Sequence, residues 1–302
     1  MMQPAVEERR VRSFDGTDIA YHTVGQGRPV LLCNGLGGSW VAWTHQIRYL
    51  SDRYRFISWD YRGLYRSGPP ATPGALQIDA HARDGLAVLD AEGVESAALL
   101  GWSMGVQVAL ETFNLAQERV SNMTLLNGVS GQIYESVMNL GFMDKVVPPT
   151  LRALGGAPRM VEAVVRQAVG FPGTVQLAKA LGLAAPTLDE DIFRALAASF
   201  KGLDMGVYLR LLELLGEHDA TPLLPRVDVP VLVVAGDRDV MTPRAAAARM
   251  AASIPGAELM VIPGATHYAA VEYPELVNLR LEKFWLERGY AAASSGLSAA
   301  AR

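Results

Sequence analysis

A chain of 302 residues is long enough for one large α/β domain that carries a smaller insertion. Half of its residues are hydrophobic and 19% are charged, as in globular proteins with a sizeable core. The net charge of −4 offers no basic surface for nucleic acid, and the sequence contains no run of 18 apolar residues. We therefore expect neither a nucleic acid nor a membrane as a partner.

Cysteine content and the amino-terminal segment bear on the expected compartment. Cys33 is the single cysteine, which excludes an intrachain disulfide and fits a reducing environment. The segment from Met1 to Arg12 carries Glu and Arg without the apolar run of a secretory signal. We expect a cytoplasmic protein, a monomer or homodimer, that acts on a small molecule.

The predicted elements alternate between strands and helices. Val11–Phe14 and Asp18–Val24 flank Asp15-Gly16, which predicts a β-hairpin. Short apolar runs with the length of buried parallel strands follow at Val30–Cys33, Arg55–Trp59, Ala97–Leu100, Met123–Leu126, Val231–Ala235 and Glu258–Ile262. Helical patterns separate them, for example at Ala80–Glu92 and Met104–Glu118. The alternation predicts an α/β fold with a mainly parallel, doubly wound sheet.

The alternation breaks between residues 131 and 219, where the pattern is helical throughout. A helical insertion within an α/β sheet predicts a cap domain. The expected division is therefore a core of residues 1–130 and 220–290, a cap of residues 131–219, and a flexible tail of small and polar residues at 291–302.

Ser103 lies in the pentapeptide Gly101-Trp102-Ser103-Met104-Gly105, a Gly-x-Ser-x-Gly motif. The motif follows one predicted strand and opens a predicted helix, the context of a nucleophile elbow. Such a turn strains the serine backbone, and glycines two residues to either side remove steric collisions. The sequence predicts that Ser103 is a nucleophile.

A serine nucleophile needs a general base, which in turn needs an orienting acid. Of five histidines, His267 follows the last predicted strand, where a loop reaches the carboxyl edge of the sheet. Asp237 and Asp239 both follow the strand Val231–Ala235, and spacing alone leaves the choice between them open. The loop Asn127-Gly128-Val129-Ser130 holds no carboxylate, which favours the later loop.

Together these motifs resemble those of the α/β-hydrolase superfamily in its capped, esterase-like form, from about residue 11 to residue 287. Gly236 to Pro243 is similar to the superfamily's G-x-x-D-x-x-x-P acid loop, which implies that Asp239 is the triad acid and Asp237 a surface or loop-bracing residue. The order Ser103, Asp239, His267 is the chain order of this fold.

Asn34-Gly35-Leu36-Gly37-Gly38 resembles the superfamily's H-G-x-G-G loop, with Asn34 in place of histidine. The resemblance implies that the backbone N–H groups of Leu36 and Met104 form an oxyanion hole. A second departure lies in the D-x-R-G-H-G-x-S segment, where Leu64 and Tyr65 replace His and Gly. We interpret this departure as a subfamily marker in a structural loop.

The expected activity is hydrolysis of a carboxylic ester, or a related acyl compound, with an apolar moiety. Trp102, Asn34, Met138 and Phe142 are the expected pocket residues, since apolar side chains of the cap would roof Ser103. C–C bond hydrolysis, lactone opening, acyl transfer and perhydrolysis would use the same triad, and a non-catalytic ligand receptor is a further alternative. No metal and no cofactor are expected, because no metal-ligand spacing, P-loop or dinucleotide fingerprint occurs.

Overall fold

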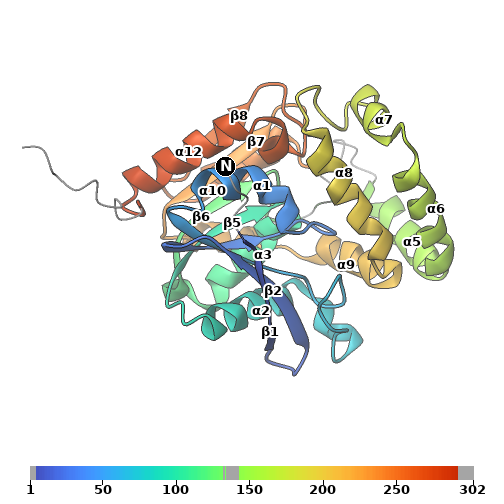
Figure 1. Ribbon diagram of the computed structural model, residues 1–302, viewed down its shortest axis with the longest axis horizontal. Helices are drawn as coiled ribbons and strands as arrows, with labels where there is room; N and C mark the ends of the chain where they lie inside the picture. Colours follow the sequence, from blue (N-terminus) through green and yellow to red (C-terminus); the bar gives the residue numbers. More distant parts are fainter. Residues whose placement is uncertain (1–4, 132, 134–142, 292–302) are drawn as a thin grey trace, which may run out of the picture.

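One sheet organises the protein in a computed structural model that describes residues 5–131, 133 and 143–291. Within those residues the sheet has eight strands in the order β1-β2-β4-β3-β5-β6-β7-β8 (Figure 1). The pairs β1–β2 and β2–β4 are antiparallel and the remaining pairs are parallel. The strands are β1 Glu7–Arg12, β2 Asp18–Val24, β3 Arg28–Cys33, β4 Tyr54–Trp59, β5 Ala97–Trp102, β6 Val120–Leu126, β7 Val231–Gly236 and β8 Glu258–Ile262.

Helices cover both faces of the sheet, which confirms the predicted fold class. The helices between or after strands are α1 Thr44–Leu50, α2 Ile78–Ala91, α3 Met104–Leu115, α10 Arg244–Ser253, α11 Ala269–Glu272 and α12 Pro274–Glu287. Short 3₁₀ turns lie at Trp40–Trp43, Pro73–Leu76, Gln117–Arg119, Phe200–Gly202 and Thr221–Arg226.

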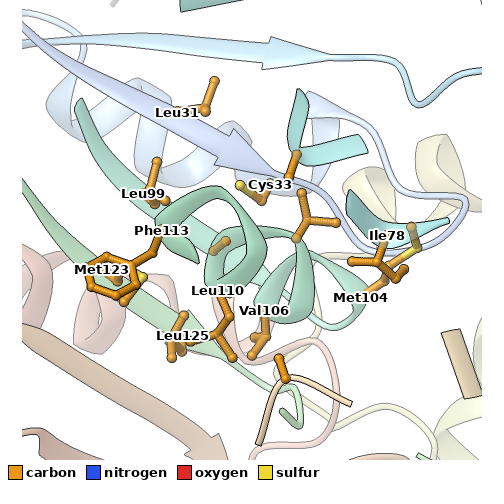
Figure 2. Close-up of a cluster of buried hydrophobic side chains, with 14 of the residues drawn as sticks. Leu31, Cys33, Ile78, Leu99, Met104, Val106, Leu110, Phe113, Met123 and Leu125 are labelled. Atoms are coloured by element: carbon orange, nitrogen blue, oxygen red, sulfur yellow. The ribbon is translucent and has the colours of Figure 1, made fainter. Parts of the chain in front are cut away.

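Alternate side chains of each central strand enter two separate cores. Leu31 and Cys33 of β3 join the core under α2, α3 and α10, whereas Val30 and Leu32 join the core under α1 and α12. Figure 2 shows the first of these cores, with α3 lying on the sheet. Because both faces are buried, the central strands are apolar along their length, which is why the sequence pattern located them.

The first strand differs from the prediction. It spans Glu7–Arg12 rather than Val11–Phe14, and it occupies the edge of the sheet. Its side chains are almost all exposed, so it carries no apolar alternation that a sequence pattern could detect. Charged pairs hold it instead: Arg9 binds Glu92, and Arg10 binds Asp18.

A group of helices follows β6 and precedes β7 in the sequence. In space these helices lie at one side of the sheet (Figure 1). They are α5 Met143–Gly155, α6 Pro158–Gly170, α7 Thr174–Ala180, α8 Glu190–Ser199 and α9 Met205–Glu217. The chain leaves and re-enters the sheet region at one point, because Gly131 and Asp219 form an isolated antiparallel bridge. The predicted tail at 292–302 lies outside the described residues.

His218 fastens the end of α9 to the sheet-covering helix α3. Its Nε2 lies 2.9 Å from Glu111 Oε1, and its Nδ1 lies 2.6 Å from Gln107 Oε1. The inserted helices are therefore tied to the same helix that begins immediately after Ser103.

Candidate active site

Ser103 occupies a strained turn between β5 and α3. Its φ of 56° and ψ of −120° place a non-glycine residue in a sparsely populated backbone region. The turn is possible only with glycine at 105, since a Cβ there would lie 1.9 Å from the Cys33 carbonyl oxygen. Gly101 is likewise enclosed, because its Cβ would lie 2.5 Å from the Gly105 carbonyl oxygen. The close packing holds the Ser103 hydroxyl at the edge of the sheet.

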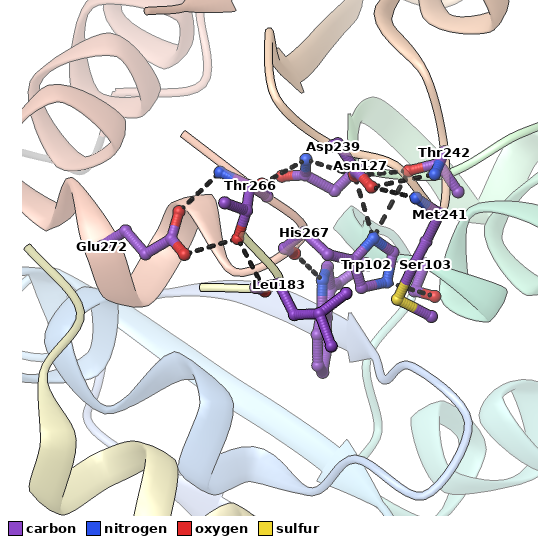
Figure 3. A network of polar contacts seen from close by, with 10 residues as sticks. All are labelled: Trp102, Ser103, Asn127, Leu183, Asp239, Met241, Thr242, Thr266, His267 and Glu272. Atoms are coloured by element: carbon purple, nitrogen blue, oxygen red, sulfur yellow. Dashed lines mark hydrogen bonds and ion pairs between the residues drawn. The ribbon is translucent and has the colours of Figure 1, made fainter. Parts of the chain in front are cut away.

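Three side chains that were predicted from sequence meet at this edge (Figure 3). Ser103 Oγ lies 2.9 Å from His267 Nε2, and His267 Nδ1 lies 2.9 Å from Asp239 Oδ2. Asp239 follows β7 and His267 follows β8, and the carboxyl ends of parallel strands meet at the same edge. An ionised carboxylate only accepts, so Nδ1–H donates to Asp239 and Nε2 is free to accept the Ser103 proton.

The Asp239 carboxylate is saturated with hydrogen bonds. Oδ1 accepts from the backbone N–H groups of Met241 and Thr242, each at 2.9 Å. Oδ2 accepts from Thr242 Oγ1 at 2.6 Å and from Asn127 Nδ2 at 2.9 Å, besides His267. Burial acts to raise the pKa of Asp239, but the charge and hydrogen bonds of His267 and Thr242 outweigh it and hold the pKa below its ordinary value.

Asp237, the other carboxylate of the same loop, points elsewhere. Its Oδ1 accepts the Gly264 N–H at 2.7 Å, which braces the loop that carries His267. The loop-bracing role that the resemblance implied for Asp237 matches this contact.

Asn127 is a site residue that sequence reasoning missed. It follows β6, between the strands that carry Ser103 and Asp239, and its φ is 45°. Its Nδ2 donates to Asp239 Oδ2 and, at 3.0 Å, to the Thr266 carbonyl oxygen. Its place at the carboxyl end of a strand was the available signal, but an amide side chain is not a candidate for the triad acid.

Glu272 is a second missed residue, buried behind the histidine loop (Figure 3). Its carboxylate accepts the Thr266 N–H at 2.7 Å and the Thr266 hydroxyl at 2.5 Å. It also accepts the Ala185 N–H at 2.8 Å, from the segment between α7 and α8. The residue before His267 is thereby fixed both to α11 and to the inserted helices.

The loop after β3 forms a tight turn beside Ser103. Gly38 N–H donates to the Gly35 carbonyl at 2.8 Å, and Gly37 has a φ of 69° that favours glycine. The Leu36 N–H donates to no described backbone carbonyl. Met104 is the first residue of α3, so its N–H has no acceptor within the helix. Both amides are available to a ligand at this edge.

Asn34 does not line the cavity above Ser103, which corrects the prediction for this residue. Its side chain is buried, with Nδ2 donating to Ser58 Oγ at 2.9 Å and Oδ1 accepting from Trp43 Nε1 at 3.0 Å. Its carbonyl accepts the Tyr61 hydroxyl at 2.6 Å. A buried amide must satisfy its polar atoms, and here that requirement directs Asn34 inward as a brace for the loop.

Tyr65, noted above only as a departure from a family motif, contacts the same loop. Tyr65 occupies the position where the common motif has glycine, and its φ of 51° lies in the left-handed region that favours glycine. Its hydroxyl donates to the Gly37 carbonyl at 2.5 Å and lies 3.2 Å from Ser199 Oγ of α8. Burial raises the pKa of Tyr65 to about 12, so the hydroxyl keeps its proton at neutral pH. The residue links the turn beside Ser103 to the inserted helices.

A cavity of about 290 Å³ opens above Ser103. Leu36 and Trp102 line it, as do residues of α8 and α9, and Trp102 Nε1 donates to the His267 carbonyl at 2.9 Å. Met138 and Phe142, two further predicted pocket residues, lie outside the described residues. The described lining is Gly35–Gly38, Trp102, Ser103, Ile133, Val169, Phe193, Leu196, Ala197, Phe200, Tyr208, Leu212, Leu215, Met241, His267 and Tyr268.

Comparison with known proteins assigns the fold to a family. Residues 28–274 match the family model described as the alpha/beta hydrolase fold. The chain belongs to this family of hydrolases. It is 29% identical over 268 residues to "Putative carbamate hydrolase RutD" of Azorhizobium caulinodans, covering 88% of this chain and 94% of that protein.

Two solved structures with low sequence identity share this alpha/beta hydrolase fold. Bromoperoxidase from Bacillus anthracis has a TM-score of 0.77 at 19% identity, covering 93% of this chain and 100% of that one. A thermophilic esterase from Thermogutta terrifontis has a TM-score of 0.73 at 23% identity, with coverage of 93% and 99%. At these identities the likeness shows the fold alone.

Among the residues that the structure describes, no group of three or more His, Cys, Asp or Glu side chains is placed to hold a metal ion. No helix in the same part of the chain is long and apolar enough to cross a membrane.

The electrostatics of Asp239 lead to a prediction for the change Thr242→Val, which removes one hydroxyl donor. Because the pKa of Asp239 is lowered in the folded protein, its ionised form stabilises the fold above its ordinary pKa of 3.8. That contribution is lost as the pH falls through the folded-state pKa. The valine is expected to raise this pKa, so the midpoint of acid unfolding should move to higher pH in a circular dichroism titration.

Thr242→Ser is the matched control, since it keeps the hydroxyl that donates to Asp239. It should unfold near the wild-type pH. An unchanged or lower midpoint for the valine variant would show that the Thr242 hydroxyl does not favour the ionised carboxylate.

Proposed function

We propose that the protein is a serine hydrolase in which Ser103, His267 and Asp239 act as a catalytic triad. The observation that carries the proposal is the unbroken series of contacts from Ser103 Oγ through His267 to Asp239 at the floor of a cavity. His267 would take the Ser103 proton as the oxygen attacks an acyl carbon. Asp239 would hold the ring in the required tautomer and stabilise its cation.

The backbone amides of Leu36 and Met104 are proposed to receive the oxyanion that forms in this step. Both lie beside Ser103, neither is used by a described backbone acceptor, and the dipole of α3 adds positive potential at Met104. Collapse of the tetrahedral intermediate would leave an acyl group on Ser103. A water molecule, deprotonated by His267, would then release the acid.

The proposed substrate is an uncharged carboxylic ester with an apolar moiety. The side chains of the described cavity lining include no Asp, Glu, Lys or Arg. Burying an unpaired substrate charge among such side chains would cost free energy. Esters and carbamates, named for one neighbour and one relative, both carry an acyl carbon open to serine attack.

The inserted helices are proposed to act as a cap that roofs this site. Residues of α8 and α9 line the cavity, and the bridge between Gly131 and Asp219 marks where the chain enters and leaves the insertion. We accordingly assign residues 131–219 to the cap, and 1–130 with 220–290 to the core.

A panel of 4-nitrophenyl esters with acyl chains of increasing length tests the proposed activity. Neutral esters with a medium-length chain should be hydrolysed best, because the cavity is at the small end of the range for ligand pockets. Esters that carry a carboxylate on the acyl chain should be poor substrates at the same chain length. A preference for the charged esters would contradict the proposed substrate class.

A further inference from the structure

Two tyrosine hydroxyls stand out in the otherwise apolar cavity. Among the described lining residues, Ser103 and His267 bind each other and Trp102 Nε1 binds the His267 carbonyl. Tyr208 and Tyr268 are the other lining side chains with an oxygen or nitrogen atom. Neither hydroxyl has a hydrogen-bond partner in the part of the chain that the structure describes. Neither hydroxyl oxygen is among the completely buried atoms without a partner. Each oxygen is therefore accessible to a ligand in the cavity that its side chain lines.

The rings of both tyrosines are held in place by neighbouring aromatic side chains. The Tyr208 ring meets Phe200 edge-on, with centroids 5.6 Å apart. The Tyr268 ring meets Phe193 edge-on at 5.2 Å and lies 5.8 Å from Trp102. Tyr208 belongs to α9 of the inserted helices, whereas Tyr268 directly follows His267 in the loop after β8. One hydroxyl therefore reaches the cavity from the inserted helices and the other from the sheet. Fixed rings give fixed donor positions, as selective recognition requires.

Both phenols are donors at neutral pH. Burial raises the pKa of Tyr208 to about 12. Burial also raises the pKa of Tyr268 to about 12, with further contributions from the Tyr208 hydroxyl and from Glu272 and Asp239. A donor in an apolar cavity gains most from a ligand oxygen that replaces its water contact.

We propose that Tyr208 and Tyr268 form a hydrogen-bonding subsite for an uncharged oxygen acceptor on the apolar part of the substrate. The preferred substrates are then neutral esters whose apolar moiety carries a second oxygen, such as a ketone or ether, rather than plain hydrocarbon esters. The inference rests on the proposed function only in taking Ser103 as the reacting residue.

Matched acyl chains test the subsite. The substrates are 4-nitrophenyl hexanoate and its 4-oxo and 5-oxo derivatives, corrected for their uncatalysed hydrolysis. The readout is the ratio of kcat/KM for an oxo ester to kcat/KM for the plain ester, which cancels general effects on folding or on the triad. Each hydroxyl that binds the ketone should multiply the wild-type ratio by about 3 to 10, starting from a value of one for no binding.

Tyr208→Phe and Tyr268→Phe should each lower that ratio by about 3- to 10-fold. Tyr49→Phe is the matched control, since its hydroxyl binds Glu282 on the surface and it does not line the cavity. It should keep the wild-type ratio. A wild-type ratio near one for both oxo esters, or a preference that survives both cavity substitutions, would overturn the inference.

Binding to the Ser103→Ala variant separates this inference from the proposed function. The affinities of the plain and oxo esters, measured by calorimetry in that background, do not require turnover. If no ester is hydrolysed by the wild type but the oxo ester binds more tightly and Tyr208→Phe removes the difference, the subsite stands and the proposed activity fails. Equal affinities in this background would overturn the subsite whatever the activity.

Discussion

Replacing Ser103 with alanine is expected to lower kcat for a 4-nitrophenyl ester by roughly 10⁴- to 10⁶-fold. The change removes the nucleophile that lies 2.9 Å from His267 Nε2, and no other described hydroxyl contacts this nitrogen. Alanine adds no atom to the crowded turn, so the fold should be retained. The measurement is steady-state hydrolysis, with circular dichroism to verify the fold.

Ser130→Ala is the matched control for this loss. Ser130 lies beyond the neighbouring strand β6, and its hydroxyl pairs with Thr221 instead of with the triad. The control should hydrolyse the ester at the wild-type rate. If Ser103→Ala retained kcat within about tenfold of wild type, the triad mechanism would be wrong, because loss of a covalent nucleophile cannot cost so little.

The largest effect on stability is expected from Asp84→Ala, which breaks a fully buried ion pair. Arg62 and Asp84 both have side chains with 0% exposure, and they form two hydrogen bonds of 2.8 and 2.6 Å. Ser13 Oγ also donates to Asp84 Oδ1 at 2.5 Å. The variant would leave the guanidinium buried with Asp15 as its remaining carboxylate partner. We expect the free energy of unfolding, measured by urea titration, to fall by about 3–5 kcal/mol.

An exposed pair provides the comparison. Arg166 and Glu162 form an i,i+4 ion pair on α6 with 59% and 35% of their side chains exposed. Arg166→Ala should change the unfolding midpoint far less, because water already screens that pair. Similar midpoints for the two variants would mean that the Arg62–Asp84 pair does not stabilise the loop after β4.

The sequence located the fold and three of the site residues for identifiable physical reasons. Strands buried on both faces are apolar throughout, and a Gly-x-Ser-x-Gly motif between a strand and a helix has few other interpretations. His267 was found because it follows a strand whose carboxyl end must lie beside Ser103. The same reasoning left Asp237 and Asp239 open, and the resemblance of Gly236 to Pro243 to the superfamily's acid loop implied Asp239. In the structure the side chains of His267 and Asp239 do meet beside Ser103.

The rest of the site depends on contacts that no local pattern encodes. Asn127 and Glu272 reach the triad and its loop from other elements, and their roles follow from where the chain places them in space. Tyr65 was visible as a departure from a motif, but its bond to Gly37 appears only once two distant loops are brought together. Asn34 was misplaced because its inward partners, Ser58 and Trp43, belong to other elements that only the fold brings against it. The edge strand β1 was misplaced because an exposed, charged strand has no apolar period.

The central claim, that Ser103 is an activated nucleophile, is tested most directly by covalent labelling. A fluorophosphonate probe should add one adduct to the folded protein, and peptide mass spectrometry should locate it on Ser103. The His267→Ala variant should label far more slowly, since the base that activates the hydroxyl is gone. A folded wild-type protein whose Ser103 remains unmodified after prolonged exposure would contradict the mechanism.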